Sequence, residues 1–212
     1  MRANQAVVPK KRTILMMKFA TLCAALVFAS PVWAECVTFK SITKGITVTH
    51  ADGSIWTVRR GARNNIRMDQ TNATGVYAKY VEGPYGVFPS ESTRNNIGST
   101  TEYTYAKAPP EPSITMDWTS NYKVNYIPNR DKSREDWRRG KARVTAADLR
   151  EVTISGCPYR VMGVDVALAS DDRVTVFHYA YFPDLRFGTQ TRITYDGGDK
   201  VEAGIVAMVP MK

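Results

Sequence analysis

Few residues in this sequence have the type and spacing that chemistry requires. The 212 residues include two histidines, His50 and His178, and three cysteines. No HxH, HExxH or CxxC spacing occurs, so the sequence predicts neither a metal site nor a cofactor. It also contains no GxSxG nucleophile elbow and no glycine-rich phosphate loop. No motif therefore supports catalysis by a nucleophile, a metal or a bound nucleotide.

His178 lies in residues 173–182, which alternate in side-chain character as a strand does. A single histidine on the apolar face of a strand is usually a hydrogen-bonded structural residue. Asp165 lies in the strand predicted just before it, and a pocket in which Asp165 meets His178 would favour an enzyme. A pocket with two carboxylates would favour one as well, because glycosidases use that arrangement.

Aromatic residues are the better candidates for ligand contact. Residues 82–92 contain two glycines, two prolines, Tyr85 and Phe88. Such a segment is either a binding loop or a packed loop whose rings fill the edge of the core. Tyrosine also provides amphipathic contact area within residues 173–182. The candidate ligand-binding residues are Tyr85, Phe88, Trp137, Tyr179 and Tyr181.

Residues 128–143 are the most highly charged part of the sequence, with seven Lys or Arg, three Asp or Glu, and Trp137. A basic segment with an aromatic residue could bind phosphates, sugar acids or anionic lipid headgroups. The alternative, which we favour, is a solvated loop with internal ion pairs, in which Ser133 begins one helical turn and Trp137 anchors the loop. The candidate anion contacts are Arg134, Arg138 and Arg139.

Residues 1–34 have the pattern of a secretory signal peptide. Five basic residues precede an apolar run at 19–30, and Val32-Trp33-Ala34 resembles a cleavage site with small outer residues. We therefore predict a mature chain that begins at Glu35, with Met17 as an alternative translation start. The apolar run is shorter than the roughly 20 residues that a transmembrane helix needs, so no span is expected after cleavage.

Removal of this leader changes the charge of the protein. The 29 Lys and Arg and the 20 Asp and Glu give the full chain a net charge of +9. Five of the basic residues and no acidic ones lie in the leader, which leaves +4 in the mature chain. Few nucleic-acid-binding proteins are so weakly basic, so nucleic acid is not an expected partner. The sequence predicts neither the identity of a ligand or envelope partner nor the oligomeric state.

Two cysteines, Cys36 and Cys157, remain after cleavage of the leader. An even pair of cysteines in an exported protein is most simply a disulfide. The leader and this pair together predict a periplasmic or secreted protein with a Cys36–Cys157 bond.

The C-terminal part of the sequence has the pattern of a β-meander. Five segments alternate or are rich in β-branched and aromatic residues, and Gly, Pro and Asp turns separate them. Residues 174–182 contain neither Pro nor a Lys, Arg, Asp or Glu, so we expect this strand to lie inside its sheet. Among its aromatic residues we expect Phe177 to be the most buried. The predicted strands are 149–156, 159–168, 173–182, 185–195 and 200–209.

Shorter strands are predicted in the N-terminal part. A hairpin joins 45–50 to 54–60, and a three-residue loop with a left-handed Gly53 places Val48 opposite Trp56. Residues 108–112 form a polyproline-like segment. Residues 35–212 are therefore a single β-rich domain or, alternatively, two tied lobes that meet near 108–112. The other predicted strands are 37–43, 66–70, 75–81, 100–106, 113–119 and 122–127.

About ten to twelve antiparallel strands with little helix predict an all-β fold, either a sandwich or an incompletely closed barrel. The function that we expect is that of an exported, soluble, non-catalytic envelope protein, a β module that binds a ligand, glycan, lipid or partner protein. The alternative is a periplasmic hydrolase or lyase that uses Asp, Tyr and Arg side chains in a groove.

Overall fold

The computed structural model describes residues 35–94, 98–171, 173–196, 198–201 and 204–212. The predicted signal peptide and the alternative start at Met17 lie outside these residues. Thirteen strands form one antiparallel sheet with the order β12-β11-β10-β9-β8-β7-β6-β5-β4-β3-β2-β1-β13. The first seven strands are β1 (Ile46–His50), β2 (Ile55–Arg60), β3 (Asn65–Thr71), β4 (Tyr77–Pro84), β5 (Glu91–Arg94), β6 (Ser99–Tyr105) and β7 (Asp117–Ile127). The others are β8 (Asp136–Ile154), β9 (Cys157–Ser170), β10 (Arg173–Phe182), β11 (Phe187–Tyr195), β12 (Gly198–Val201) and β13 (Ile205–Pro210).

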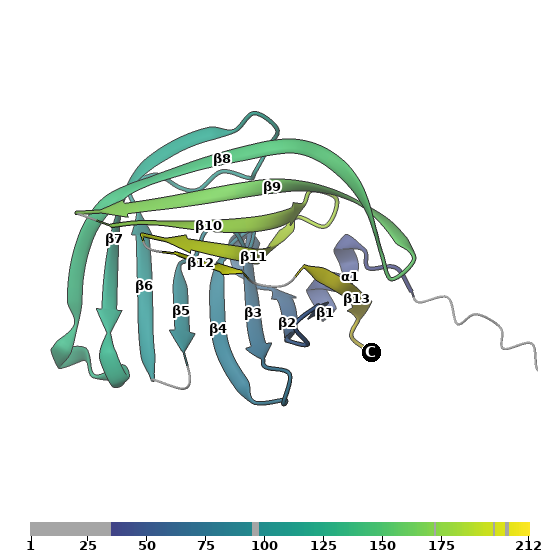
Figure 1. The fold of residues 1–212 in the computed structure, drawn as a ribbon, viewed down its shortest axis with the longest axis horizontal. Helices are drawn as coiled ribbons and strands as arrows, with labels where there is room; N and C mark the ends of the chain where they lie inside the picture. The colour runs from purple at the N-terminus through teal and green to yellow at the C-terminus, as the bar shows by residue number, and fades with distance from the viewer. Residues whose placement is uncertain (1–34, 95–97, 172, 197, 202–203) are drawn as a thin grey trace, which may run out of the picture. The chain divides into compact units, whose positions relative to one another are not determined.

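The sheet curls into a nearly closed barrel. Strands β3 to β7 run side by side, and the long strands β8 to β11 cross over them (Figure 1). Strands β12 and β13 are the two ends of the sheet, and no pairing between them seals the seam among the residues that the structure describes. The prediction of an all-β fold with little helix is confirmed, and of the two predicted architectures the structure has the incompletely closed barrel and not the sandwich.

The β1–β2 hairpin has the register that the hydrophobic pattern predicts. Val48 pairs with Trp56, and both side chains are buried. Gly53 in the turn has a φ of 79°, which favours glycine. A one-residue slip would move every apolar side chain to the outer face, and burial of one face therefore fixes the register.

Strand β10 lies inside the sheet as predicted, between β9 and β11. The predicted order of burial along its aromatic face is wrong, however. Tyr181 is 0% exposed and Tyr179 is 4% exposed, whereas Phe177 is only partly buried. Tyr181 packs beside Val87 and Phe88 of the β4–β5 loop, which fills what we call the closed end of the barrel, whereas Phe177 lines the cavities described below.

Three further predictions of local structure are wrong. Residues 37–43 contain helix α1 (Phe39–Lys44) in place of a strand, because Thr38 and Ser41 form a capping box that starts the helix. Residues 113–119 and 122–127 are not two strands. Most of them form the single strand β7, whose Ser120 is buried and accepts a hydrogen bond from the amide of Lys107.

The charged segment 128–143 is a loop only in its first half. Two short 3-10 helices, Pro128–Arg130 and Lys132–Arg134, form the turn, and strand β8 begins at Asp136. Asp131 rather than Ser133 caps the second of them, since its side chain accepts from the Ser133 amide. The charged residues after it can form a strand because ten of the β8 residues pair with β7, while the side chains of Asp136, Arg138 and Arg139 stay exposed to water.

The predicted disulfide is present between Cys36 and Cys157. It ties the segment before α1 to the first residue of β9, where Cys157 is buried in a hydrophobic cluster with Ile42 of the helix. No helix within the described ranges is long and apolar enough to cross a membrane.

Candidate ligand-binding cavity

The barrel strands surround a cavity of about 420 Å³. Its wall is built from alternate residues of β4, β5, β6, β10 and β11, because every second side chain of a strand points to the same face of the sheet. The rings that line it belong to Tyr103, Tyr126, Phe177, Tyr179 and Tyr195.

A second cavity of about 290 Å³ adjoins the first. The two share Tyr103, Tyr126, Arg173, Thr175 and Phe177 as lining residues, so they are neighbouring parts of one luminal space. The second part reaches strand β8, where Asp136 and Arg138 also line it. These two form an ion pair with an N–O distance of 2.8 Å.

Basic side chains face the first cavity from two sides. Lys79 of β4 lies directly opposite Arg94 of β5, and Arg173 comes from the start of β10. The ammonium group of Lys79 donates to Oε1 of Gln190 at 3.2 Å and lies 5.6 Å from the centre of the Trp56 ring. No Asp or Glu is among the described residues that line this first cavity. Its wall is therefore aromatic and positively charged.

The hydroxyl of Tyr103 in this wall is a neutral hydrogen-bonding group. Burial raises the pKa of Tyr103 to about 12, and the smaller opposing effect of the Arg94 charge does not reverse this. Tyr103 therefore keeps its proton at neutral pH and can donate it to a bound acceptor.

The segment that joins β4 to β5 folds into the barrel and closes the cavity on one side. Phe88 has no exposed surface and packs edge-on against Trp118 and Tyr105. Pro89 lines the cavity itself. Gly83 permits this path, since a Cβ there would lie 1.8 Å from the carbonyl oxygen of Phe88.

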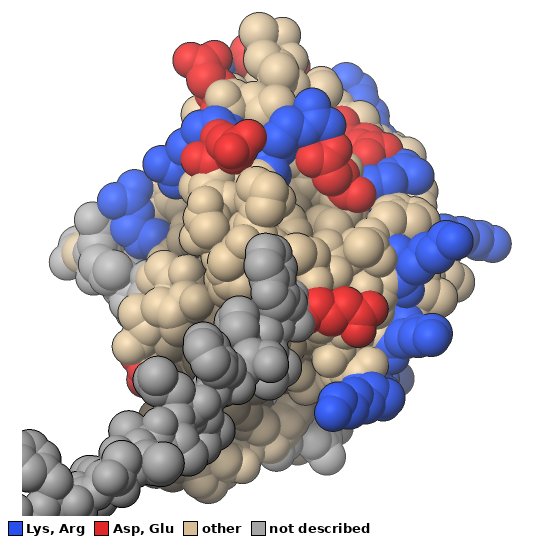
Figure 2. All heavy atoms as spheres, turned by 90° about the vertical axis from the view of Figure 1, so that its right-hand side faces the viewer, with Lys and Arg blue, Asp and Glu red and all other residues tan. Residues whose placement is uncertain are grey.

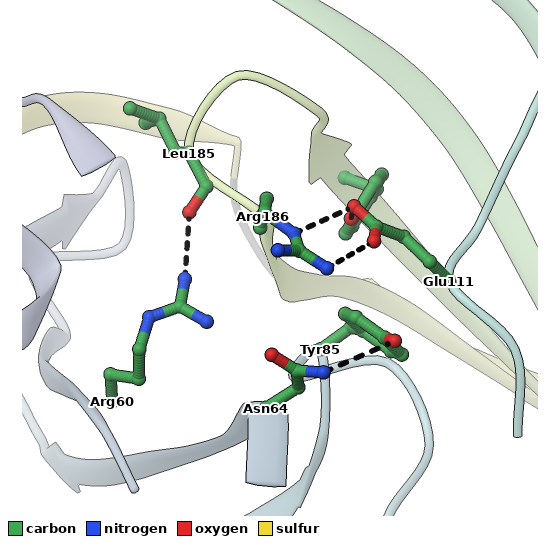
Figure 3. Close-up of polar contacts among 7 residues, drawn as sticks. Arg60, Asn64, Tyr85, Glu111, Leu185 and Arg186 are labelled. Atoms are coloured by element: carbon green, nitrogen blue, oxygen red, sulfur yellow. Dashed lines mark hydrogen bonds and ion pairs between the residues drawn. The ribbon is translucent and has the colours of Figure 1, made fainter.

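Figure 3 shows how polar contacts fasten the closed end of the barrel. Arg186, in the turn between β10 and β11, forms a two-pronged ion pair with Glu111, and the Tyr181 hydroxyl donates to the same carboxylate at 3.2 Å. Arg60 donates to the carbonyl oxygen of Leu185 at 3.2 Å. These contacts hold the 106–116 segment, which joins the neighbouring strands β6 and β7, against the β10–β11 turn.

The closed end also has a strained backbone. Asn64, Tyr85 and Arg186 have φ values of 65°, 56° and 53°, in the left-handed region that non-glycine residues rarely adopt. The side-chain amide of Asn64 donates to the Tyr85 hydroxyl, and the Arg186 guanidinium lies over the Tyr85 ring. Such strain persists only where surrounding contacts fix the conformation, which these interactions do.

The structure separates the aromatic residues that the sequence singles out. Tyr179 lines the cavity, while Tyr85 and Tyr181 are buried at the closed end. Phe88 is a core residue beneath the cavity, and Trp137 is 54% exposed.

The three predicted anion contacts are also separated. Arg138 faces the second part of the cavity beside Asp136, and Arg134 is exposed in the β7–β8 turn. Arg139 lies opposite Lys123 on the outer face of the barrel, where both line a separate open groove.

Sequence reasoning missed most of the cavity. Lys79, Tyr103 and Arg173 were not among the candidates, although each lies in a predicted strand, and Arg94 lies outside every predicted strand. The alternation of residues 99, 101 and 103 along β6 indicates that they share a face. It does not indicate which strands face one another across the barrel.

His178 and Asp165 do meet, on the outer face of the sheet. Asp165 Oδ1 lies 2.8 Å from His178 Nδ1, and Thr194 Oγ1 lies 2.9 Å from His178 Nε2. This order of groups resembles the acid, base and hydroxyl of a hydrolase triad. None of the three lines the luminal cavity. A row of polar side chains across three strands is also a common way to stabilise a sheet.

A row of glutamates lies on strands β4 to β6, where Glu82 pairs with Glu91 and Glu91 pairs with Glu102. Partial burial, followed by the charges of Glu102 and Glu82, raises the pKa of Glu91 above its ordinary value of 4.5. The folded protein therefore binds this proton more tightly than the unfolded chain does. The resulting contribution to stability is complete below pH 4.5 and is lost as the pH rises through the folded-state pKa.

We therefore expect Glu91→Gln to increase the free energy of unfolding at neutral pH by about 0.2–1 kcal/mol, because like charges on paired strands repel. The gain should vanish in acid, where the wild-type carboxyl is protonated in both states. Urea unfolding at neutral and acidic pH measures this, with Glu35→Gln, a change at an exposed carboxylate, as the control. A loss of stability at neutral pH would show that Glu91 has a favourable partner.

Figure 2 shows the face of the molecule that lies at the right of Figure 1. Lys and Arg gather along one side of this face, and both signs of charge mix across its top. Lys79, Arg94 and Arg173 line the cavity between the strands.

Comparisons of this chain with protein-family models, with curated protein sequences and with solved structures found no match.

Proposed function

We propose that this is an exported, non-catalytic protein of the cell envelope that binds a small organic ligand inside its barrel. The observation that carries the proposal is the luminal cavity of about 420 Å³, lined by five aromatic rings. Binding sites for small molecules are typically concave, mostly apolar and aromatic, and supplied with a few polar groups that orient the ligand. The leader-like N-terminus and the Cys36–Cys157 disulfide support export.

The rigid surroundings of the cavity support binding as well. The Phe88 loop forms one side of it, and the Glu111–Arg186 ion pair fastens the 106–116 segment to the β10–β11 turn. A cavity that exists before the ligand arrives avoids much of the entropy cost of ordering side chains on binding.

Filling the cavity tests this function. Thr101 lines the cavity, and we expect Thr101→Trp to weaken saturable binding of N-phenylnaphthylamine, a neutral aromatic probe, by at least about tenfold. Thr104→Trp is the matched control, since Thr104 is on the same strand but lies exposed in the outer groove. Fluorescence titration measures both. Native mass spectrometry of protein from its own envelope should detect a bound small molecule.

Equal loss of binding in the Thr101 and Thr104 variants would place the probe outside the cavity. Absence of saturable binding in the wild type, with no copurified molecule, would reject the proposed function.

A hydrolase is the second candidate, and the contact between Asp165, His178 and Thr194 is the observation that favours it. A hydrolase also needs a substrate pocket and donors for the developing negative charge beside its nucleophile. The luminal cavity does not supply these, because the three residues are on the outer face of the sheet. Loss of ester hydrolysis in both His178→Ala and Thr194→Val would support this candidate over the first.

A further inference from the structure

We infer that the ligand of the luminal cavity is an amphipathic organic anion, whose charged group lies among Lys79, Arg94 and Arg173. This inference rests on the proposed function and adds the chemical class of the ligand and its orientation. The charged group would be a carboxylate, a sulfonate or a phosphate monoester, joined to an aromatic or aliphatic body.

The first argument is the pairing of like charges inside the barrel. Lys79 and Arg94 are directly opposite each other on β4 and β5, and both face the cavity. Like charges at such positions repel. An anion between them would replace repulsion with two favourable interactions.

The second argument is the orientation of these cations. The Gln190 side chain, which is 4% exposed, accepts a hydrogen bond from the Lys79 ammonium group and holds it toward β11. Arg173 approaches from the start of β10, across the cavity from β4 and β5. Guanidinium groups bind carboxylates and phosphates through paired N–H donors, so two arginines and a lysine suit an oxyanion.

The third argument concerns the acidic residues nearby. Asp136 forms an ion pair with Arg138 at an N–O distance of 2.8 Å. The Asp196 carboxylate accepts a hydrogen bond from the backbone amide of Val174 at 2.9 Å. No ion pair joins Arg94 or Arg173 to an Asp or Glu within the part of the chain that the structure describes. The positive charges of Arg94 and Arg173 are therefore left for a ligand to neutralise.

The fourth argument is the rest of the wall, which suits the apolar part of such a ligand. The rings of Phe177 and Tyr179 lie nearly parallel, with their centres 6.5 Å apart, and Tyr103 lines both parts of the cavity. Hydroxyl groups of Ser92 and Thr175 lie in the same wall and can donate to the anionic group or to a polar substituent. Cations and rings in one cavity match a molecule that has a charged end and an apolar body.

Two fluorescent probes with the same ring system test the inference. Anilinonaphthalenesulfonate carries a sulfonate that N-phenylnaphthylamine lacks. We expect the wild type to bind the sulfonated probe at least about tenfold more tightly than the neutral one, a difference of about 1.4 kcal/mol. Added salt should reduce this preference, because Arg94 and Arg173 are exposed to solvent.

The variant that tests the cations is Arg94→Gln/Arg173→Gln. It should lose about tenfold in affinity for the sulfonated probe and less than about threefold for the neutral probe, which also shows that the barrel remains folded. The control is Arg59→Gln/Arg150→Gln, which removes two exposed arginines that do not line the cavity and should change neither affinity.

Each outcome has a distinct meaning. Equal affinity of the wild type for both probes would overturn the anionic class and leave the proposed function standing. An unchanged preference in the Arg94/Arg173 variant would overturn the placement of the charged group. Inorganic phosphate should not displace the sulfonated probe at matched ionic strength, and displacement would identify a site for a free anion. Failure of both probes to bind would instead count against the proposed function.

Discussion

Cys36→Ala/Cys157→Ala is expected to lower the free energy of unfolding by about 4–5 kcal/mol, the largest effect of any change proposed here. The bond joins residues 121 positions apart, and such a cross-link removes much of the conformational freedom of the unfolded chain. In the folded protein it holds the segment before α1 against β9, where Cys157 is 3% exposed. Since a domain of this kind is stable by only about 5–15 kcal/mol, the loss would bring it close to unfolding at body temperature.

Urea unfolding of the wild type with and without a reducing agent measures the same quantity without mutation. Reductant should shift the wild type to the midpoint of the double variant and leave the double variant unchanged. A difference below about 1 kcal/mol would mean that the reduced unfolded chain is already compact, or that contacts of α1 alone hold the N-terminal segment.

Phe88→Ala is expected to lower the free energy of unfolding by about 3–5 kcal/mol, the usual range for emptying a fully buried aromatic site. Phe88 is 0% exposed, and its ring packs against Trp118 and Tyr105 from two other strands. The affinity of the variant for the neutral probe should also change, because Phe88 and Pro89 belong to the loop that bounds the cavity.

Phe177→Ala is the matched control, on the other side of the same cavity. Phe177 is only partly buried, so its loss should cost less than about 2 kcal/mol while weakening binding of the neutral probe. Equal destabilisation by the two changes would show that the luminal space is filled in solution and that Phe177 belongs to the core.

The sequence alone determined the fold class, the β1–β2 register, the position of β10 inside the sheet, and the disulfide. Each of these depends on a local or compositional feature. Alternating apolar residues in 46–58 allow one buried face, and a run without Pro or charge at 174–182 excludes an exposed edge. The two cysteines that follow the leader leave a single pairing.

Predictions from local sequence were wrong where contacts with the rest of the barrel stabilise another structure. The apolar residues of 37–43 have a strand-like composition, but the Thr38 capping box and the burial of Ile42 against the barrel stabilise a helix. The charged residues that open β8 have no strand pattern of their own. They are extended because β7 offers a hydrogen-bonded partner along their whole length.

Only the tertiary structure decided the candidate site. Tyr179 was recognised from its strand, but Arg94 and Arg173 are 79 positions apart in the sequence and meet because the sheet curls until β5 and β10 face one cavity. Curvature depends on twist summed over thirteen strands and on the loop around Phe88 that fills one end, and neither is encoded in a short window of sequence. The two-residue repeat of a strand shows which residues share one of its faces. Closure of the barrel decides which faces line the same cavity, and the proposed binding chemistry depends on that closure.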